Sequence, residues 1–559
     1  MELIRESLFW LGEVPGRFWT VAWLSFAVTG LLAVAPLRRP AARTAGWFAV
    51  SAVLTLLIFR APTWFYRVDL NPDEAQIVAG ALTLDRFHLP WKYLDPTTHG
   101  PLCEYGLVLV SWLGAPFNYV SARVVAALMQ AGALLAVWAA LRRIMAEAPA
   151  RLAVLPGLAF WSLTSWDDFL HYSSELPGIL LMAWGVVFLV RVATAPRASG
   201  RPALSAFVAG LCLGAVPYGK LQSTPQAALI GLAGLVAVWR QTVDPAVRRR
   251  LLAALVAGAV APTVLHGLYL VMFNLGSQFW FTYVVSALDY IDSAGHRLAD
   301  MPGLFLHFSA TSPSFAWFLW GNLAFSLLYL RAPQRPEPGR KVLLLAWLSL
   351  AVAWFTVLRP GREVVHYLHL LVIPVTTLAG ATLGLAFPGD GRPGFRAHAP
   401  VLGVFLLLGL LPQILNHAAA YHRFVGHVRE HWHAPVSPAA TYLRERAVPG
   451  DTVAMWGWAP HLLVETGLPH GTREAHSASQ ISQWPLRRFF VDRYLNDLER
   501  RQPRWFVDAV GPGAFVFSDR PQHAHESIPA LASLVAQRYE PAAEIGAVRI
   551  YRLKERAGR

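Results

Sequence analysis

Residues 19–37 read WTVAWLSFAVTGLLAVAPL, an apolar run without a single charged residue. A helix needs about 20 apolar residues to cross the hydrocarbon core of a bilayer, so this run is long enough to span it. It is too long for the core of a cleaved signal peptide, and Pro36 directly follows Ala33-Val34-Ala35. We therefore expect a retained membrane anchor.

The composition of the whole chain agrees with this reading. Of 559 residues, 55% are hydrophobic and only 15% are charged, with a mean hydropathy of +0.40. An ordinary soluble domain carries about 25% charged residues, so a single soluble globular protein is excluded. A dozen spans would use about 240 residues, which leaves room for one soluble domain of ordinary size.

Eleven further apolar runs follow the first, which predicts an α-helical polytopic membrane protein with about twelve transmembrane helices. Residues 1–416 form this predicted membrane module, and 63–120 form its first external loop. The predicted spans after the first lie at 45–62, 121–141, 152–171, 175–193, 203–219, 225–240, 251–273, 312–330, 341–358, 364–386 and 400–416.

Charge predicts the orientation of these spans. Lys and Arg total 48 against 34 Asp and Glu, and in a membrane protein such an excess collects in cytoplasmic loops. Arg38, Arg39 and Arg43 follow the first run, so that loop is predicted to be cytoplasmic and the chain start external. No basic stretch interleaves with aromatic residues, so nucleic acid is not an expected partner. Further arginine-rich loops, predicted to be cytoplasmic, lie at 142–143, 191–201, 248–250, 331–341 and 392–396.

Residues 102–117 are apolar enough to span, but a span there would place Arg142 and Arg143 outside. We therefore predict a juxtamembrane helix within the first external loop. After residue 417 short apolar strands alternate with helices, which predicts a periplasmic α/β domain over 417–559. Its predicted helices are 437–446, 484–501 and 528–539, and its predicted strands are 452–458, 504–508 and 548–553.

The first external loop contains Asn71-Pro72-Asp73-Glu74-Ala75. An Asn cap, a Pro at the first helical position and an early Glu are a helix-start signature, and that purely structural interpretation is strong. A helix that starts at the membrane surface also presents two adjacent carboxylates there. One of them could serve as a general base.

Cations in predicted external loops run against the positive-inside bias and therefore need a reason. Lys220 lies in a tight external turn, where it could bind phosphate or simply extend to the interface. Arg362, His366 and Tyr367 crowd the loop at 359–367, and Arg297 lies in the loop after residue 274. A bound phosphate would account for these positions, because Arg and Lys are its usual partners.

An acidic cluster, Asp167, Asp168, Tyr172 and Glu175, lies at the outer end of an apolar run. Carboxylates at membrane depth are costly and suggest function, here acceptor binding, although these could only flank the turn. Paired Asp residues could also hold a divalent cation, but spacing identifies no third acidic ligand. The two cysteines and the histidines at 417, 422, 427, 431 and 433 match no short metal-ligand motif, so no metal site is assigned.

The order of these parts resembles the polytopic type C glycosyltransferases (GT-C), in particular bacterial relatives of protein O-mannosyltransferases and lipid A aminoarabinose transferases. The resemblance rests on the anchor, the loop with Asp73-Glu74, the many spans, His366-Tyr367 followed by Pro374, and a terminal α/β domain. It implies inverting transfer of a sugar from a polyprenyl-phosphate donor to a lipid, glycan or protein hydroxyl at the periplasmic face.

The resemblance also implies roles for residues. Asp73 would be the general base, Glu74 would bind the acceptor or hold the helix start, and Lys220, Arg362 and His366 would contact the donor phosphate. Relatives often carry a lysine before the proline that ends the first loop, whereas this chain has Thr98-His99-Gly100-Pro101, so His99 or Lys92 would substitute. No cofactor is implied, and a divalent cation stays open.

Two other functions fit parts of the pattern. A transporter or flippase of lipid-linked sugars would also place polar residues in the membrane, but transporters tend to show repeated halves, which this sequence lacks. A surface-polysaccharide polymerase or ligase would differ mainly in its acceptor. No Asn-x-Ser/Thr acceptor site occurs, which favours a bacterial envelope, so we expect the cytoplasmic (inner) membrane of a bacterium.

Overall fold

The computed structural model describes residues 15–37, 42–194, 202–292, 298–311, 313–330, 337–387, 395–432 and 434–555. The chain packs into two compact units. Unit 1 comprises Met1–Phe65, Val124–Tyr269 and Asp289–Arg429, and unit 2 comprises Tyr66–Arg123, Leu270–Leu288 and Glu430–Arg559. The predicted division of the chain at residues 416 and 417 stays a prediction.

Among the described residues, nine helical segments are long and apolar enough to cross a membrane, and each matches a predicted span. The last is longer than predicted, because its helix continues past residue 416 to Glu430. The helices that form these segments are α2 (Pro15–Val34), α3 (Ala42–Trp64), α6 (Tyr119–Leu141), α9 (Glu175–Thr194), α11 (Thr224–Gln241), α12 (Pro245–Met272), α17 (Glu337–Leu358), α18 (His369–Ala386) and α19 with α20 (Phe395–Val404 and Leu411–Glu430).

Three predicted spans have a different form. The predicted span 152–171 is not one helix: α8 (Leu155–Leu163) ends at the extended Thr164, and a short 3₁₀ turn, η2 (Asp167–Phe169), follows. A nine-residue helix is only about 13 Å long, too short to cross a bilayer. The spans predicted at 203–219 and 312–330 correspond to the shorter apolar helices α10 (Pro202–Ala215) and α16 (Pro313–Tyr329).

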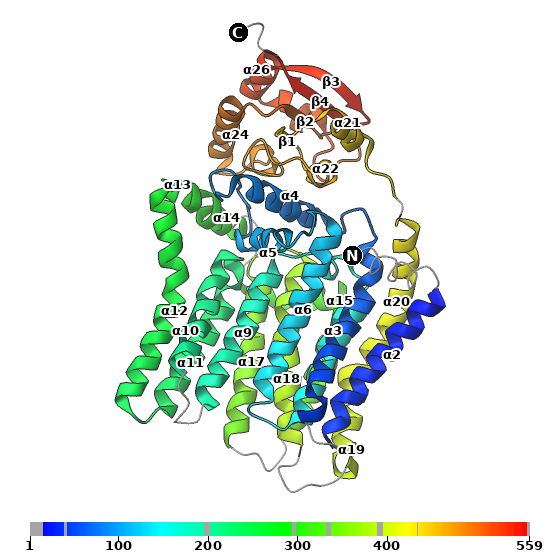
Figure 1. The fold of residues 1–559 in the computed structure, drawn as a ribbon, viewed down its shortest axis with the longest axis vertical. Helices are drawn as coiled ribbons and strands as arrows, with labels where there is room; N and C mark the ends of the chain where they lie inside the picture. The colour runs from blue at the N-terminus through cyan, green and yellow to red at the C-terminus, as the bar shows by residue number, and fades with distance from the viewer. Residues whose placement is uncertain are drawn as a thin grey trace. The chain divides into compact units, whose positions relative to one another are not determined.

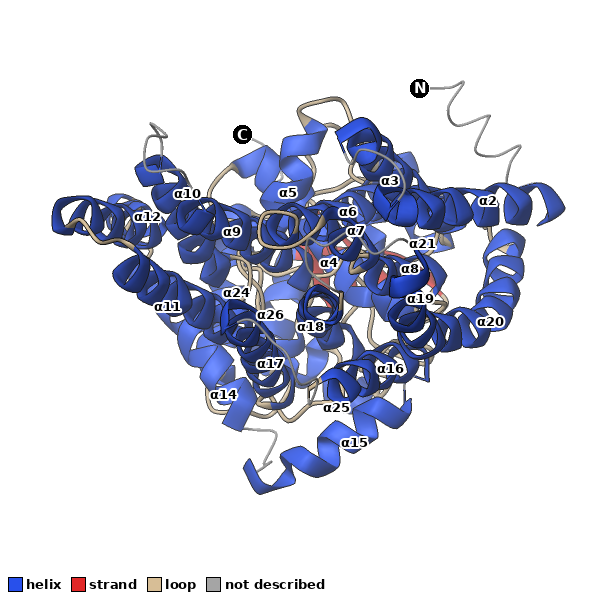
Figure 2. Cartoon of the chain, turned by 90° about the horizontal axis from the view of Figure 1, so that it is seen from below, coloured by secondary structure: helices blue, strands red, loops and turns tan. Residues whose placement is uncertain are grey.

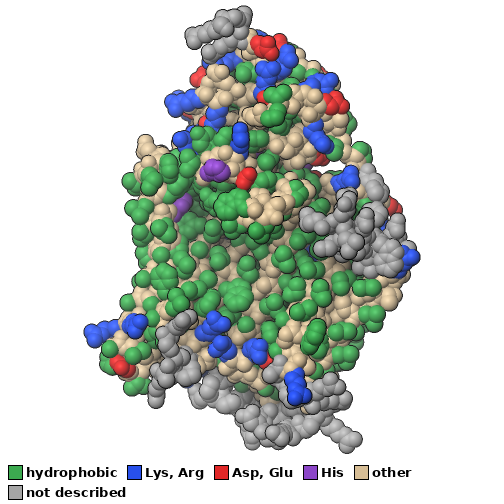
Figure 3. All heavy atoms as spheres, in the orientation of Figure 1, with side chains coloured by type: hydrophobic (Ala, Val, Ile, Leu, Met, Phe, Trp, Pro, Cys, Tyr) green, Lys and Arg blue, Asp and Glu red, His purple; other side chains and the backbone are tan. Residues whose placement is uncertain are grey.

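Unit 1 is a bundle of these helices with α18 at its centre, packed against α9, α16 and α17 (Figure 2). Small residues let some helices approach closely, as membrane bundles commonly require. A Cβ on Gly210 of α10 would lie 2.1 Å from the backbone oxygen of Leu255 on α12, so only glycine fits there. Hydrophobic side chains cover the visible face of the bundle, and several Lys and Arg side chains lie at its lower end (Figure 3).

Unit 2 holds a four-stranded sheet in the order β1-β2-β4-β3 (Figure 1). β1 (Val453–Trp456) and β2 (Trp505–Asp508) pair in parallel, with Val453 opposite Trp505, and β4 (Val548–Leu553) runs antiparallel to β2. These three strands confirm the prediction, whereas β3 (Tyr539–Ile545) was not predicted. The predicted helices are confirmed as α21 (Pro438–Arg446), α24 (Arg487–Arg501) and α26 (Pro529–Arg538).

Two helices of the first loop belong to unit 2. α4 (Pro72–Phe87) packs against α22 (His461–Thr466) of the terminal segment and against α5 (Leu102–Ser111). The ten residues of α5 make a helix of about 15 Å, which is too short to span and agrees with the predicted juxtamembrane helix. The first loop and the terminal segment therefore form one folded body.

Candidate functional site

The predicted helix start at Asn71 is confirmed. The Asn71 side chain caps α4 by accepting a hydrogen bond from the backbone N–H of Asp73 at 2.9 Å, and Pro72 occupies the first helical position. This cap places Asp73 and Glu74 in the first turn, where the helix dipole favours negative charge.

The two adjacent carboxylates have different surroundings. Glu74 is fully buried, and Arg123 donates to it from Nε at 2.9 Å and from Nη2 at 2.6 Å. Arg123 also donates to the backbone oxygens of Tyr66 and Val68, so the pair fastens the chain that leads into α4. Asp73 is half-buried. Glu74 was a predicted acceptor contact, but its two oxygens are already engaged by a structural partner.

Asp73 shares one face of α4 with Gln76, because residues three apart on a helix are neighbours. His476 reaches this face, with Nε2 3.2 Å from the Gln76 side-chain oxygen. Its Nδ1 accepts from the backbone N–H of Ala478, so Nε2 carries the proton and donates. Burial lowers the pKa of His476 to about 4, although the charges of Asp73 and Asp95 act in the opposite direction. The imidazole is therefore neutral at pH 7.

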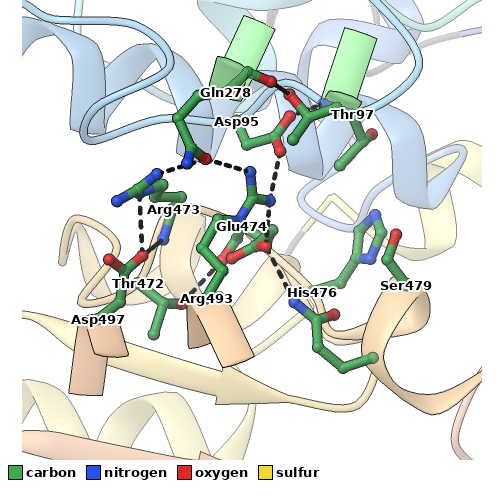
Figure 4. A network of polar contacts seen from close by, with 12 residues as sticks. Asp95, Thr97, Gln278, Thr472, Arg473, Glu474, His476, Ser479, Arg493 and Asp497 are labelled. Carbon is green, nitrogen blue, oxygen red and sulfur yellow. Dashed lines mark hydrogen bonds and ion pairs between the residues drawn. The ribbon is translucent and has the colours of Figure 1, made fainter. Parts of the chain in front are cut away.

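A buried polar network lies near this face (Figure 4). Arg493 Nη2 lies 2.5 Å from both Asp95 Oδ2 and Glu474 Oε1, and Gln278 accepts from Arg473 at 2.7 Å. Burial raises the pKa of Glu474, while the two carboxylates hold the pKa of Arg493 above its ordinary value despite burial. The network joins the first loop, residues 270–288 and the terminal segment within unit 2.

The other two predicted residues of the first loop have local partners. His99 Nε2 lies 2.7 Å from Glu104 Oε1, and both side chains are buried. Lys92 is exposed and lies over the Tyr93 ring at 5.4 Å. Each of these contacts has a structural explanation within unit 2.

In unit 1, six of the predicted residues come together where three helices begin. Lys220 forms a buried ion pair with Glu175, the first residue of α9, and donates to Ser174 Oγ at 2.8 Å. Ser173 also donates to Glu175. Lys220 directly precedes the turn η4 (Leu221–Ser223) that leads into α11. We call the group of Asp168, Glu175, Lys220, Arg362, His366 and Tyr367 the polar cluster.

Asp168 and His366 form the second pair of the polar cluster. His366 Nδ1 lies 3.3 Å from Asp168 Oδ1, and Trp166 donates to the other carboxylate oxygen at 3.1 Å. Burial alone would raise the pKa of Asp168, but the hydrogen bond and charge of His366, the charge of His171 and the Trp166 hydrogen bond outweigh it and lower this pKa to about 2. Asp168 is therefore ionised at neutral pH.

Aromatic rings complete the polar cluster. The Lys220 ammonium lies 4.6 Å from the centre of the Tyr367 ring, and the Tyr367 hydroxyl lies 3.4 Å from that of Tyr290. The Arg362 guanidinium stacks over the Tyr290 ring at 4.5 Å. Two cations and a histidine thus gather with two carboxylates, an arrangement whose hydrogen-bond donors could hold an anionic group.

A buried arginine lies behind the polar cluster. Arg60 of α3 donates to the side-chain oxygen of Gln130 at 3.0 Å and to the backbone oxygen of Phe169 at 2.5 Å. Phe169 directly follows Asp168, so Arg60 fixes the turn that carries this carboxylate. Within the part of the chain that the structure describes, Arg60 Nε and Nη1 have no hydrogen-bond partner.

The remaining predicted residues are Asp167, Tyr172 and Arg297. Asp167 is exposed, and its backbone oxygen accepts from His171 Nδ1 at 3.1 Å. Tyr172 is fully buried, and Arg297 and His433 lie outside the described residues. In unit 2, Asp508, His525 and Glu526 come close enough to share a cation. Arg520 and Arg549 already pair with these carboxylates, so ion pairing explains that group.

The sequence analysis did not identify several residues around the polar cluster and around α4. Arg60 and Arg123 had a usable signal, because each is a charge inside or at the edge of an apolar run. No sequence signal marked Asp95, Glu474 and Arg493, since isolated charges in polar segments usually lie at the surface.

Comparison with solved structures identifies the fold. ArnT from Cupriavidus metallidurans bound to undecaprenyl phosphate is similar with a TM-score of 0.54 and 17% sequence identity, over 90% of this chain and 98% of that chain. Its apo state is similar with a TM-score of 0.51 and 17% identity, over 91% and 98%. This chain has the GT-C glycosyltransferase fold. The predicted fold class is confirmed, and the GT-C fold with its apolar helices makes this a multi-pass membrane protein.

Searches by sequence give no relative. No known protein family matches the chain, and no curated protein matches it. The GT-C fold is therefore recognised here from its three-dimensional arrangement and from the order of its parts.

Proposed function

We propose that this protein is a membrane glycosyltransferase that moves a sugar from a polyprenyl-phosphate donor to an acceptor hydroxyl. The observation that carries the proposal is the GT-C fold, shared over 98% of the length of ArnT in a structure bound to undecaprenyl phosphate. The polar cluster supports it, because ionisable side chains inside a membrane bundle are costly and usually serve a function.

In this proposal the polar cluster binds the donor phosphate. Lys220 is its buried ammonium, Arg362 offers the forked donors that suit phosphate oxygens, and His366 adds a further donor. Glu175 and Asp168 orient Lys220 and His366 through the contacts described above. These side chains stabilise the negative charge that develops on the phosphate as it leaves.

Asp73 is the proposed general base. Both oxygens of Glu74 are engaged by Arg123, so the base role falls on its half-buried neighbour. The acceptor hydroxyl gives its proton to Asp73 while its oxygen forms a bond to the anomeric carbon. The bond from that carbon to the phosphate oxygen breaks, and polyprenyl phosphate leaves with the electron pair. A single displacement of this kind inverts the anomeric configuration.

The proposed location is the cytoplasmic membrane of a bacterium, with the reaction at the periplasmic face. The arginine-rich loops that alternate along the chain support this orientation. A cysteine-accessibility assay on intact cells tests it: Cys substitutions at exposed positions of unit 2 should react with an impermeant maleimide added outside. Labelling only after cell lysis would reverse the orientation.

The function is tested with purified protein in nanodiscs, radiolabelled polyprenyl-phosphate sugars and membrane extracts as acceptors. Asp73→Asn should lower transfer by about 10²-fold to 10⁴-fold, the usual contribution of general base catalysis. Asp85→Asn is the matched control, because Asp85 lies in the last turn of the same helix, and it should keep wild-type turnover. No donor consumption with any acceptor, together with measured lipid movement between leaflets, would make the protein a transporter.

A further inference from the structure

Arginines gather at the end of the unit 1 bundle where α12 begins (Figure 1). Val238 of α11 and Leu251 of α12 belong to one buried hydrophobic cluster there, and Phe188 of α9 packs against it. The Arg248 guanidinium lies 4.4 Å from the centre of the Trp239 ring, which links the start of α12 to the end of α11. The group that we call the arginine patch consists of Arg191 of α9, Arg240 of α11 and Arg248, Arg249 and Arg250 of α12.

The arginine patch has almost no acidic counterpart in the sequence. Between Glu175 and Asp289, Asp244 is the single acidic residue, against seven arginines. Its carboxylate accepts hydrogen bonds from the backbone N–H groups of Ala246 and Val247 at 2.7 and 3.3 Å, so it caps the start of α12. Among the residues that the structure describes, no carboxylate forms an ion pair with an arginine of the patch.

The stability of α12 does not explain these arginines. Arg248, Arg249 and Arg250 lie in its first two turns, and positive charge near the start of a helix opposes the helix dipole. Arg240, Arg249 and Arg250 are exposed, so their donors are accessible from outside the bundle. A concentration of like charge attracts ions of the opposite sign, and the guanidinium fork suits phosphate oxygens in particular.

An exposed apolar stripe continues from the arginine patch along α11. Leu232, Val236 and Trp239 are exposed and spaced at i, i+4 and i+7, so they share one face of this helix. α11 and α12 lie at the margin of the bundle, where lipid surrounds a membrane protein (Figure 2). Tryptophan is typical of the boundary between hydrocarbon and headgroups. The sequence of apolar stripe, tryptophan and arginines therefore corresponds to the acyl chain, interface and phosphate of a phospholipid.

We propose that the arginine patch binds the headgroup of an anionic phospholipid whose acyl chains lie along the exposed stripe of α11. The guanidinium groups donate to the phosphate oxygens, and Trp239 lies at the level of the interface. A free phosphate ion offers the same oxygens but has no apolar part to cover the stripe. The proposal rests on the membrane fold and is independent of the proposed transfer reaction.

The test measures lipid binding to the full-length protein purified in detergent. The probe is phosphatidylglycerol with pyrene in one acyl chain, and energy transfer from tryptophan to pyrene reports its binding. Unlabelled cardiolipin and phosphatidylglycerol should displace the probe at concentrations at least about tenfold lower than phosphatidylcholine does, because each arginine near a membrane surface contributes about a fivefold gain in affinity for anionic lipid. Millimolar inorganic phosphate should leave the probe bound.

The triple variant Arg248→Gln/Arg249→Gln/Arg250→Gln should weaken binding of the probe by about tenfold to hundredfold. The charge-matched control removes three exposed arginines of unit 2 and should bind the probe as the wild type does; it is Arg444→Gln/Arg446→Gln/Arg488→Gln. Both variants should unfold near the wild-type temperature, since none of the six side chains is buried. If the first variant fails to fold, Arg240→Gln/Arg249→Gln replaces it and should weaken binding by about fivefold or more.

The proposal is overturned if the triple variant of α12 keeps the wild-type affinity, or if the control variant weakens binding of the probe to the same extent. Equal competition by phosphatidylcholine and cardiolipin would also overturn it, because the charge of the headgroup would then have no effect. Displacement of the probe by millimolar phosphate would assign the patch to a soluble anion in place of a lipid.

Discussion

Glu74 and Arg123 form a two-point ion pair with no exposed side-chain surface on either partner. The pair joins the first turn of α4 to the first turns of α6, and the same guanidinium holds the backbone at Tyr66 and Val68. This relationship separates two carboxylates that the sequence presents as equals. Glu74 holds the loop in place, whereas its neighbour Asp73 is only half-buried.

We expect Glu74→Gln to destabilise the protein. The substitution leaves the Arg123 charge buried without its carboxylate, and removing one partner of a buried pair costs about 3–5 kcal/mol. Arg123→Lys keeps the charge but cannot form the fork, so it should also be destabilising. Thermal unfolding in detergent measures both variants, with Asp85→Asn as the control on the same helix. Unchanged unfolding of Glu74→Gln would show that the pair contributes little.

The second prediction separates the ion pairing of Lys220 with Glu175 from its proposed role in binding phosphate. Lys220→Met should lower stability by about 3 kcal/mol, because it leaves the Glu175 carboxylate buried and unpaired. The double variant Lys220→Met/Glu175→Gln removes both charges and should recover most of that stability. Both variants should bind undecaprenyl phosphate about tenfold to hundredfold more weakly, since a charged hydrogen bond is lost.

Equilibrium binding of radiolabelled undecaprenyl phosphate to protein in nanodiscs provides the measurement for Lys220. Glu175→Gln alone keeps the ammonium, so it separates the loss of the Lys220 charge from the loss of the carboxylate that orients it. If the double variant is stable and binds the lipid as tightly as the wild type, Lys220 serves only to neutralise Glu175.

The third prediction concerns the stability of the folded protein at acidic pH. Burial is the main cause that lowers the pKa of His470 to about 3, and His476 behaves similarly with a pKa of about 4. Both residues take up protons in the unfolded chain near pH 6.5 but stay neutral in the folded chain. Their contribution to the free energy of unfolding is therefore complete above pH 6.5. It falls as the pH drops below that value, by about 2 kcal/mol per histidine at pH 5.

Unfolding temperature measured from pH 7 to pH 5 tests this expectation. His470→Gln should flatten the pH dependence relative to the wild type, because one proton-binding site of the unfolded chain is removed. Asp168 does not contribute in this range, since a folded-state pKa of about 2 removes its stabilisation only between about pH 4 and pH 2. An equally steep profile in His470→Gln would assign the acid sensitivity to other groups.

The fourth prediction concerns the Arg493 network. Arg493→Gln leaves Asp95 and Glu474 facing each other without their shared cation, so it should be strongly destabilising, by about 3–5 kcal/mol. Glu474→Gln should cost less, because burial already raises the pKa of this carboxyl and thus disfavours its charge. Limited proteolysis of unit 2, compared with that of the exposed control Arg488→Gln, measures the difference. Equal effects of Arg493→Gln and Glu474→Gln would contradict it.

Local signals in the sequence predicted much of the fold. The Asn71 cap, the nine matching spans and strands β1, β2 and β4 depend on short apolar patterns and on capping residues. β3 was missed because Tyr539–Ile545 contains two glutamates and Pro541, and it is an edge strand whose register shifts between Pro541 and Ala543. The predicted span 152–171 failed because the polar segment after Leu163 ends the helix.

The candidate site was only partly predictable. Lys220, His366 and Asp168 could be named because charges beside apolar runs are unusual. The contacts between these residues could not be predicted, since Asp168 and His366 are 198 residues apart and no local pattern links them. The same holds for Arg123, whose pairing with Glu74 leaves Asp73 as the carboxylate that can be proposed as the general base.

The Asp95–Arg493 ion pair also constrains the order in which the molecule can be completed. The two residues are 398 positions apart, and they lie in one folded body with residues 270–288. At about 5–20 residues per second, a ribosome needs about 20–80 s to proceed from one to the other. Throughout this interval Asp95 lacks its cation, so unit 2 can assemble only after the intervening helices have been synthesised. Assembly of unit 2 therefore ends with the pairing of a loop made early in synthesis and a helix made near its end.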